Sequence, residues 1–473
     1  MASEDLRDWL AKVEAAGSLR KIDGVDWNLE VTCFADPKVS GDRTSVFLFD
    51  NIKDYPSGYK LAVARLSTPK ETALTLNIPD GSQMELIDTL RKKLPQWEAS
   101  LDKYPPKIVK GGPVLENVLS GDDVDLLRFP VPKWNELDGG RYIGTGDIVI
   151  TRDPDTGEVN LGTYRVMIQD EKTTGIFIAP GRHGRINLQK YHDKGQACPI
   201  AVSVGHHPLL FSMGFSGLKG CEYNWMGAIR GEPTEVITEE ITGLPIPANS
   251  EIVIAGWCPP DKRKMEGPFA EWTGYYGKPA APGLIIEVER IYYRNNPILL
   301  GFANLRPQPG ITMMVKTLMD CAIMHNELVR FGVPDVRGVY YSEDGPSTII
   351  VVSIKQRHAG HAKQAGLVIS QSNTVLQGKY VIVVDEDIDP SNMHDVLWAV
   401  GFRSNPEKDI DIIRNCRTEP LDLTWVPDTP IVTSMAIIDA CKPFDRIDKF
   451  PTAIGISPEL ANKFREKWKL PSP

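Results

Sequence analysis

Apolar residues near the start of the chain recur at helical spacing. Leu6, Trp9, Leu10 and Val13 fall on one face of a helix, and Gly17 follows them as a stop signal. The pattern therefore predicts an amphipathic helix at the N-terminus. It continues as two strand-like runs and a second amphipathic helix, at 45–49, 61–65 and 84–93.

The pattern changes between about 114 and 300, where short apolar runs are separated by Gly/Pro-rich turns. Many short strands at this spacing are typical of a barrel or a sandwich. Helical signals are sparse here, and one candidate helix covers 187–194. The predicted strands cover 146–151, 162–168, 174–179, 200–204, 251–255 and 284–293.

Strand and helix patterns alternate after about residue 310. Such alternation predicts βαβ units and a parallel or mixed sheet with helices packed on it. The predicted order is helix, strand, helix, strand, helix, at 313–331, 348–354, 358–365, 380–384 and 392–400.

A final helix is predicted at 458–468. Leu460, Phe464 and Trp468 form an apolar stripe along it. A terminal helix has to bury such a stripe, so it packs either on its own domain or on another subunit.

Length and charge narrow the classes of domain and partner. At about 100–200 residues per domain, a chain of 473 residues has two to four domains. Lys and Arg number 53 against 62 Asp and Glu, which gives a formal net charge of −9. Because phosphate-binding surfaces are basic, this balance argues against nucleic acid or an anionic membrane as the main partner.

Targeting and cross-linking are also constrained. The segment 1–12 lacks the basic and apolar regions of a signal peptide, and the apolar runs are too short to span a bilayer. Seven cysteines are scattered along the chain without a CxxC pair, which argues against a disulfide framework or a zinc ribbon. We therefore expect a cytoplasmic protein with reduced thiols.

Motifs of the common nucleotide-binding and hydrolytic enzymes are missing from the sequence. It has no GxxxxGK(S/T) loop, no GxSxG elbow and no HExxH motif, and no GxGxxG follows the strands of the βαβ region. P-loop, hydrolase, metalloprotease and Rossmann interpretations therefore lose their usual support.

Two carboxylates stand out in the segment 264–274 (KMEGPFAEWTG). Glu266 and Glu271 lie on either side of Gly267–Pro268, which interrupts any helix, and aromatic residues surround them. A carboxyl group held in an apolar setting has a raised pKa, which suits a general acid near neutral pH. The alternative is a pair of surface glutamates in a turn.

Arg165 lies in the predicted strand at 162–168 among apolar neighbours. A buried arginine needs a carboxylate partner, because leaving the charge unpaired costs several kcal/mol. The alternative is an arginine on the solvent face of a half-exposed strand.

Three other polar groups are candidates for anion or metal binding. His183 lies between Arg182 and Arg185 beside two glycines, a cluster that either binds an anion such as phosphate or is polar surface. Glu222, in an aromatic-rich stretch, is either a metal ligand or an exposed glutamate. The acidic run 385–389 (DEDID) is either a Mg²⁺ site or a solvated helix N-terminus.

Together these groups form an order that resembles the UbiD family of prenylated-FMN-dependent reversible decarboxylases, which includes ferulic, vanillate and protocatechuate decarboxylases. The order comprises Asn160, Arg165, His183, Glu222, and the pair Glu266 and Glu271 within an EGPFxE motif. The resemblance extends along most of the chain, and further segments that carry it are DLRDWLAKVEAAGSLRKI, NLGTYRVM, SIKQRHAGHAKQAG and YVIVVDEDIDP.

The resemblance implies a multi-domain α/β and β fold. Its parts are an N-terminal α/β domain, a central split β-barrel related to flavin reductases that binds prenylated FMN, a C-terminal α/β domain, and a linker with a terminal helix. In this sequence they correspond to 1–110, 111–305, 306–440 and 441–473.

It also implies a metal-assisted cofactor site. The phosphate of prenylated FMN is bound through Mn²⁺ or Mg²⁺ with K⁺ alongside, and Asn160, His183 and Glu222 correspond to the metal ligands. The other residues expected to bind the cofactor are Gly162, Thr163, Tyr164, Arg165, Arg182, Ser212 and Met213, the last two in a loop that meets the flavin ring.

For catalysis, the resemblance implies that Arg165 pairs with Glu266 and orients the substrate carboxylate. Glu271 is the general acid that protonates the carbon after CO₂ leaves, and the cofactor forms a covalent adduct with the substrate and acts as electron sink. The substrate is an aromatic, heteroaromatic or α,β-unsaturated carboxylic acid. Arg306 and Gln308 are expected to face it, with a structural or interface role as the alternative for Arg306.

Two other functions remain open at this point. A flavin-binding oxidoreductase on a split barrel would need a nicotinamide site but neither Arg165 nor the glutamate pair, and a cofactor carrier would need no turnover. The presence of Arg165, Glu266 and Glu271 together favours a decarboxylase. The resemblance further implies a flavin prenyltransferase as cofactor supplier and a homodimer or higher homo-oligomer.

Overall fold

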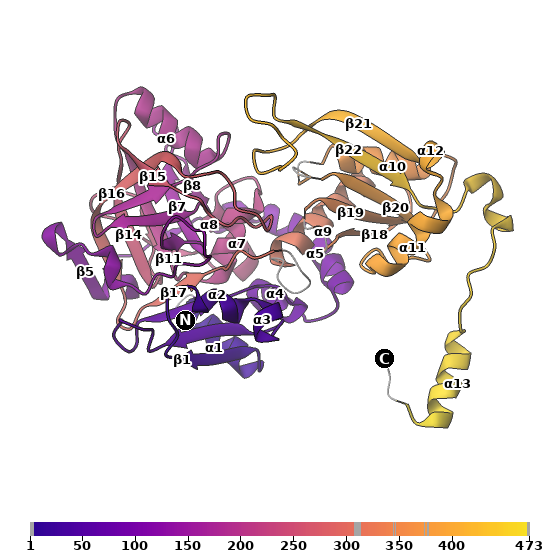
Figure 1. Cartoon of the computed structure of the whole chain (residues 1–473), viewed down its shortest axis with the longest axis horizontal. Helices are drawn as coiled ribbons and strands as arrows, with labels where there is room; N and C mark the ends of the chain where they lie inside the picture. The colour runs from indigo at the N-terminus through magenta and orange to yellow at the C-terminus, as the bar shows by residue number, and fades with distance from the viewer. Residues whose placement is uncertain are drawn as a thin grey trace.

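The computed structural model describes residues 4–306, 314–343, 345, 347–372, 374–375 and 378–470. Figure 1 shows a larger lobe built from the N-terminal and central parts of the chain, a smaller C-terminal lobe beside it, and a helix set apart at the C-terminal end. Within these described ranges, no helix is long and apolar enough to cross a membrane.

The N-terminal part is a four-stranded sheet with helices packed on it, in the strand order β1-β2-β3-β17. α1 (Leu6–Ala15) has the predicted apolar face, because Leu6, Trp9, Leu10 and Val13 are all buried. The strands are β1 (Leu19–Asp23), β2 (Val46–Asp50), β3 (Lys60–Val63) and β17 (Ile298–Gly301), and the other helices are α2 (Glu30–Ala35), α3 (Pro37–Ser40) and α4 (Pro69–Leu76). α5 (Gln83–Glu98) packs mainly against the later helix α9 (Met314–Arg330).

β17 joins this sheet from a distant part of the sequence. It pairs in parallel with β3, with Ile298 opposite Lys60 and Gly301 opposite Val63. The range 111–305 expected for the central domain therefore contributes one strand to the N-terminal sheet. Because parallel strands end at the same edge, the segments that follow β3 and β17 leave the sheet side by side.

The central part is a ten-stranded antiparallel sheet that curls into a half-barrel (Figure 1). Its main path has the order β6-β9-β10-β16-β14-β11-β7-β8, and β5 and β15 both pair with β16. The short strands predicted for this region are thus present, apart from the one predicted at 162–168. They are β5 (Asn117–Ser120), β6 (Tyr142–Gly144), β7 (Asp147–Arg152), β8 (Val159–Gly162), β9 (Val166–Asp170), β10 (Thr173–Ile176), β11 (Cys198–Val204), β14 (Ile252–Cys258), β15 (Arg263–Glu266) and β16 (Ala281–Tyr293).

β8 and β9 lie near opposite ends of this path, although only residues 163–165 separate them in sequence. The sheet has to curl for one short connection to join its two ends. The prediction of a single strand over 162–168 is therefore wrong, because β8 ends at Gly162 and β9 begins at Val166. Arg165 lies at the gap between the sheet ends instead of within a strand.

Three helices and a small sheet pack around the curled sheet. The helix predicted at 187–194 is present but begins earlier, at His183, and ends at Asp193. The helices are α6 (His183–Asp193), α7 (Pro208–Ser216) and α8 (Glu222–Arg230), and the small sheet joins β13 (Pro245–Pro247), β12 (Glu235–Thr238) and β4 (Lys107–Ile108). Short 3₁₀ turns cover Leu101–Lys103, Pro113–Glu116, Gly121–Asp123, Leu126–Arg128 and Phe444–Lys449.

The C-terminal part confirms the predicted strand–helix alternation. Its sheet has the order β18-β19-β20-β22-β21, in which β19, β20 and β22 pair in parallel and both edge strands pair antiparallel. The strands are β18 (Val336–Tyr341), β19 (Ile349–Ile354), β20 (Tyr380–Asp385), β21 (Ile410–Arg417) and β22 (Val432–Asp439), and the helices are α9 (Met314–Arg330), α10 (His361–Ser370), α11 (Met393–Arg403) and α12 (Pro406–Asp409).

α13 (Pro458–Trp468) stands apart from both lobes (Figure 1). Its stripe is uncovered, with Leu460 57%, Phe464 54% and Trp468 59% exposed. Of the two alternatives for this helix, packing on its own domain is therefore not what the chain does.

Candidate active site

Arg165 is bound by two glutamates. Its guanidinium makes a bidentate pair with Glu266, with Nε–Oε1 at 2.9 Å and Nη2–Oε2 at 2.8 Å. Its Nη1 donates to Oε1 of Glu271 at 2.5 Å. The side chains of Arg165, Glu266 and Glu271 are buried, with 8%, 5% and 10% of their surfaces exposed. The arginine thus has the carboxylate partners that burial requires, and the alternatives of a solvent-facing arginine and of surface glutamates are wrong.

The position of Glu266 depends on glycines in the neighbouring strands. Glu266 is the last residue of β15, which pairs with β16. A Cβ on Gly283 of β16 would lie 2.9 Å from Cβ of Glu266, and a Cβ on Gly175 of β10 would lie 3.3 Å from its Cγ. Larger residues there would displace the carboxylate. Tyr142 adds a further hydrogen bond, because its Oη donates to Oε1 of Glu266 at 3.1 Å.

Glu271 is held through its backbone. Its N–H donates to the carbonyl of Tyr275 at 2.9 Å, which closes a turn. The preceding residue, Ala270, is fixed from two sides, because its N–H donates to Asp138 Oδ1 at 2.9 Å and its carbonyl accepts from Asn304 Nδ2 at 3.0 Å. Asn304 follows β17, so the N-terminal sheet helps to place Glu271. Sequence reasoning missed Asp138 and Asn304, because neither lies in the motif that they support.

Aromatic rings enclose this network. The guanidinium carbon of Arg165 lies 4.3 Å from the ring centroid of Phe177 and 5.3 Å from that of Phe269. Burial raises the pKa of Glu271, Arg165 opposes the rise, and the negative charge of Glu266 adds to it. One guanidinium cannot neutralise two carboxylates, so the site favours a proton on one of them.

Glu222 and Asn160 meet at β8. Glu222, the first residue of α8, accepts the N–H of Leu161 through Oε2 at 3.0 Å. Burial raises the pKa of its carboxyl group to about 7, and no cation pairs with it among the described residues. Asn160 Nδ2 is buried without a hydrogen-bond partner. A partly buried carboxyl group close to an amide side chain provides oxygen ligands of the kind that suit a divalent cation, and Glu222 is not the exposed glutamate of the alternative.

Tyr164 links β8 to the start of α6. Its hydroxyl accepts the N–H of Gly184 at 3.3 Å, next to His183, which is the first residue of the helix. Its ring lies against two glycines, because a Cβ on Gly162 would come within 2.4 Å of the ring and one on Gly184 within 2.8 Å. This packing brings His183 toward the strand that carries Asn160. No group of three or more His, Cys, Asp and Glu forms in the described part of the chain, and the expected ligand set contains only two residues of these types.

Ser212 and Met213 do not lie in a loop, so that prediction is wrong. They belong to α7, which begins with Pro208 and is capped by His207 through Nδ1. Ser212 Oγ donates to the carbonyl of Pro208 at 3.0 Å, and both predicted side chains are buried. The glycines of FSMGFSG favour a loop locally, but burial of the apolar residues in the core outweighs that local preference.

Arg182 precedes α6 and is bound by the C-terminal lobe. Its Nη2 lies 2.7 Å from Oε2 of Glu419. No motif marks Glu419, and sequence reasoning missed it. Arg306 is exposed at the end of a described range, and Gln308 lies outside the described residues.

The acidic run 385–389 forms ion pairs within the C-terminal lobe. Asp387 makes a bidentate pair with Arg403, with both distances 2.9 Å, and binds Lys442 Nζ at 2.9 Å. The N-terminus of α11 is capped by Asn392 instead. These contacts account for the run without a cation or a cap.

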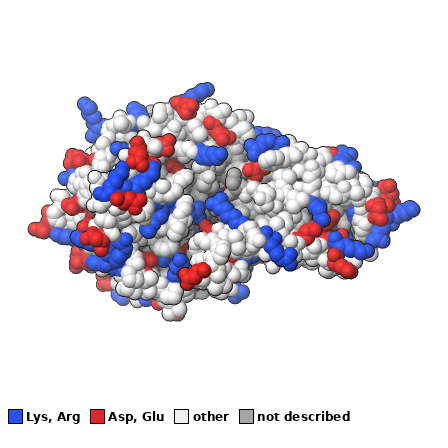
Figure 2. Space-filling model, turned by 90° about the horizontal axis from the view of Figure 1, so that it is seen from above, with Lys and Arg blue, Asp and Glu red and all other residues white. Residues whose placement is uncertain are grey.

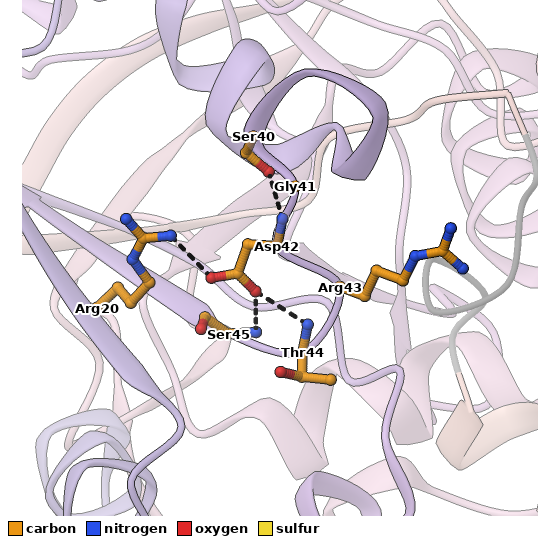
Figure 3. A pocket seen from close by; sticks show the side chains of 7 residues that line it. All are labelled: Arg20, Ser40, Gly41, Asp42, Arg43, Thr44 and Ser45. Atoms are coloured by element: carbon orange, nitrogen blue, oxygen red, sulfur yellow. Dashed lines mark hydrogen bonds and ion pairs between the residues drawn. The ribbon is translucent and has the colours of Figure 1, made fainter.

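A separate surface cavity of about 450 Å³ lies in the N-terminal part and is lined by Arg20 and residues 40–45. Figure 3 shows Asp42 at its centre, which accepts hydrogen bonds from Arg20 at 2.9 Å and from the N–H groups of Thr44 at 3.0 Å and Ser45 at 2.9 Å. This carboxylate is satisfied within the loop. The cavity shares no residue with the Arg165 network, so we do not assign it to the same site.

The chain matches three family models that together span most of its length. They describe the N-terminal, Rift-related and C-terminal domains of 3-octaprenyl-4-hydroxybenzoate carboxy-lyase, and they match residues 10–90, 107–307 and 312–440.

Relatives and solved structures agree with these models. A phenolic acid decarboxylase of Streptomyces sp. (strain D7) is 30% identical, over 98% of this chain and 97% of its own. The UbiD-class enzyme HmfF from Pelotomaculum thermopropionicum, in complex with FMN, has a TM-score of 0.83 and 27% identity, over 97% of this chain and 98% of that chain. Vanillic acid decarboxylase from Sedimentibacter hydroxybenzoicus, in closed form, has a TM-score of 0.82 and 28% identity, over 99% of both chains.

These matches confirm the resemblance drawn from the order of the motifs. The α/β multi-domain architecture with a curled half-barrel sheet is that of UbiD-class structures. This chain belongs to the UbiD family of carboxy-lyases.

Proposed function

We propose that this protein catalyses the reversible, non-oxidative decarboxylation of an aromatic carboxylic acid with prenylated FMN as cofactor. The observation that carries the proposal is the sharing of one buried guanidinium, Arg165, between Glu266 and Glu271. Membership of a carboxy-lyase family and an FMN-bound structural relative support it.

Arg165 is suited to orient the substrate carboxylate. A guanidinium has five N–H donors, and three of them donate to the two glutamates. The remaining two can bind a carboxylate of the substrate. The bidentate pair with Glu266 holds the guanidinium plane while this happens.

Glu271 is suited to deliver the proton. Its Oε1 is engaged by Arg165, so the proton is carried on Oε2. When the bond to the carboxyl carbon breaks, CO₂ leaves, and Glu271 protonates the carbon that held it. In the carboxylation direction Glu271 removes that proton. Prenylated FMN, when bound, supplies the sink for the electron pair of the breaking bond.

The residues around β8 fit a metal-assisted phosphate site. Asn160, His183 and Glu222 would hold Mn²⁺ or Mg²⁺, which would neutralise the cofactor phosphate in an acidic protein, with K⁺ alongside. The raised pKa of the Glu222 carboxyl group, which no cation offsets among the described residues, and the position of Asn160 next to Leu161, whose N–H binds Glu222, support this assignment. The other cofactor-binding residues of the proposal are Gly162, Thr163, Tyr164, Arg165, Arg182, Ser212 and Met213, in a central domain that we take to be a split β-barrel.

The substrate class follows from the walls of the site. Phe177 and Phe269 offer flat apolar surfaces beside Arg165, which suits an aromatic or heteroaromatic acid. Relatives that are named phenolic acid and vanillic acid decarboxylases support this class. We retain Arg306 as a residue that recognises a second polar group on the ring.

Two partners belong to the proposal. A flavin prenyltransferase supplies the cofactor, and a second copy of the chain covers the apolar stripe of α13. The exposure of Leu460, Phe464 and Trp468 supports self-association, because an uncovered stripe of this kind is stable only against a partner.

The proposed activity is tested by expressing the protein with a flavin prenyltransferase and measuring CO₂ release from a panel of aromatic acids. Glu271→Gln keeps the size of the side chain but cannot deliver a proton, so we expect an activity loss of about 10²–10⁴-fold. Glu158→Gln, on an exposed loop, is the matched control and should behave as wild type. Near-wild-type turnover in Glu271→Gln would contradict the proposed role, and NAD(P)H oxidation without CO₂ release would favour the oxidoreductase alternative.

A further inference from the structure

The β21–β22 hairpin brings the C-terminal lobe close to the active site. β21 ends at Arg417 and β22 begins at Val432, and the connection between them, 418–431, projects from the C-terminal sheet toward the central sheet (Figure 1). In the view of Figure 2, a hollow separates the two lobes, and charged side chains of both signs lie around it.

Glu419 forms an ion pair that crosses between the lobes. Its Oε2 lies 2.7 Å from Nη2 of Arg182, with 18% of the glutamate side chain and 47% of the arginine side chain exposed. In the described part of the chain, this is the one ion pair between the ranges 111–305 and 314–440. The ion pair can therefore form only when the hairpin lies close to the central sheet, and it breaks when the hairpin moves away.

The arginine of this pair lies next to an expected metal ligand, His183. Arg182 immediately precedes α6, which begins with His183. Tyr164 contacts the same turn through the N–H of Gly184. Arg182 thus links the hairpin to the start of α6. The start of α6 in turn contacts Tyr164, which lies next to Arg165 in the β8–β9 connection.

The charge of Glu419 also acts on Glu271. Burial raises the pKa of Glu271, Arg165 opposes this, and the negative charges of Glu266 and Glu419 add to the rise. The charged groups that act most on the pKa of Glu271 are Arg165 from the β8–β9 connection, Glu266 from β15 and Glu419 from the hairpin. Glu419 is the one among them that belongs to the other lobe.

We propose that Glu419 is a positioning residue of this active site, which acts through Arg182 to hold the hairpin closed over the Arg165–Glu266–Glu271 network and adds a second negative charge near Glu271. This proposal rests on the proposed function, in which Glu271 acts in its protonated form. A closed hairpin favours that form, and an open hairpin withdraws the charge that favours it. Closure and readiness to donate a proton are thereby coupled.

The first test measures closure without any reaction. Hydrogen–deuterium exchange of the cofactor-free full-length protein is compared between wild type and Glu419→Gln, which keeps the size of the side chain and removes its charge. We expect faster exchange of the backbone amides in 418–431 in the variant. The charge-swapped double variant Arg182→Glu, Glu419→Arg should restore slow exchange, because it rebuilds the pair in reverse.

The second test measures the effect on the acid. In protein expressed with a flavin prenyltransferase, we expect kcat/KM of Glu419→Gln to fall about twofold to fivefold, the effect of an ion pair at this exposure. Removing a negative charge lowers the pKa of Glu271, so the alkaline limb of the pH–rate profile should move to lower pH. A role confined to packing would leave that limb in place.

Asp428→Asn is the matched control, because Asp428 is an exposed carboxylate in the same hairpin. It should leave exchange, kcat/KM and the pH–rate profile unchanged. Wild-type exchange in Glu419→Gln would overturn the closure role, and an unmoved alkaline limb would overturn the action on Glu271. If the wild-type protein released no CO₂ from any acid, the proposed function would fail, while the exchange comparison would still decide whether the pair holds the hairpin.

Discussion

Two buried networks of arginine and glutamate hold this molecule together, and they differ in their balance of charge. At the junction of α1 with the central sheet, Glu251 is fully buried and binds Arg7 through two bonds of 2.8 and 2.9 Å. Arg294 lies 3.2 Å from Glu251 and 2.6 Å from Asp5. That network sets two cations against two carboxylates. The Arg165 network sets one cation against two.

The comparison shows that bidentate geometry alone does not identify an active site. Both networks contain a fork of nearly ideal length, and burial raises the pKa of both Glu251 and Glu271. Glu251, however, is surrounded by donors, because Ile298 N–H also donates to it at 3.1 Å. Its role is to join α1, the central sheet and β17. Among the described residues, Glu271 forms an ion pair with Arg165 alone and shares it with another carboxylate, which leaves Glu271 able to take and release a proton.

Breaking the balanced network should give the largest effect. Glu251→Gln removes the charge of a fully buried carboxylate that binds the half-buried Arg7 and the buried Arg294, and we expect a loss of about 3–5 kcal/mol in the free energy of unfolding. Urea unfolding followed by tryptophan fluorescence measures it. CO₂ release per folded molecule should stay at the wild-type level.

Glu240→Gln is the control for this change, because Glu240 pairs with Arg290 but is 78% exposed. Its stability should change by less than about 0.5 kcal/mol. If Glu251→Gln were as stable as wild type, the structural role of the balanced network would be wrong.

Matched arginine substitutions should separate the two networks. Lysine keeps the charge but cannot form the planar fork, so Arg165→Lys should misplace both glutamates and lower kcat/KM by about 10²-fold. Arg7→Lys disturbs the corresponding fork on Glu251 and should lower the unfolding midpoint while the activity per folded molecule is kept. Equal activity losses in the two variants would remove the distinction that we draw.

The pH dependence should follow the raised pKa of Glu271. The protonated form is the acid, so the decarboxylation rate should be highest below this pKa and fall about tenfold per pH unit above it. The folded state holds this proton more tightly than the unfolded chain. The stabilisation from Glu271 is therefore complete below the unfolded pKa and is lost as the pH rises through the folded pKa.

Unfolding midpoints across a pH series measure this linkage. The wild type should lose stability as the pH rises through the folded pKa of Glu271. Glu271→Gln should not show this loss, because glutamine does not titrate. A wild-type profile in the variant would mean that another group titrates.

The smallest effect is expected for Tyr142→Phe. It removes the hydrogen bond of 3.1 Å to Glu266 and keeps the ring, whose centroid lies 4.4 Å from that of Phe269. One hydrogen bond of this kind corresponds to a change of about twofold to tenfold in kcat/KM. Tyr223→Phe, which loses a bond of 2.7 Å to the carbonyl of Pro245, is the control and should leave activity unchanged. Unaltered kinetics in Tyr142→Phe would show that Glu266 is held by Arg165 alone.

Much of the fold was predictable because the spacing of apolar residues over a few positions indicates a helix or a strand. The stripe of Leu6, Trp9, Leu10 and Val13 predicted α1, and all four residues are buried. The strand–helix alternation after residue 310 predicted the mixed sheet of the C-terminal lobe. The run 162–168 was predicted wrongly, because an apolar run has the same appearance whether the chain continues in one strand or crosses from β8 to β9.

The residues of the Arg165 network were predictable from the sequence, but the residues that hold this network in place were not. Burial of Arg165 required a carboxylate, and the resemblance to the UbiD family implied Glu266 as its partner. The aromatic setting of Glu266 and Glu271 predicted raised pKa values for their carboxyl groups. Asp138, Asn304 and Glu419 carry no local signal of their roles. The helix that contains Ser212 was missed because its glycines favour a loop. Its apolar residues nevertheless pack in the core, and this packing stabilises the helix.

By itself, the sequence determined most of the element types, the family, and the arginine and two glutamates on which the proposed chemistry depends. Only the tertiary structure decided which atoms of Arg165 bind which glutamate, that the sheet ends meet at this residue, and that Glu419 pairs with Arg182. The reason is separation along the chain. Arg165 is 101 residues from Glu266, and Arg182 is 237 residues from Glu419, so these contacts depend on strand pairing and lobe packing that no local pattern encodes.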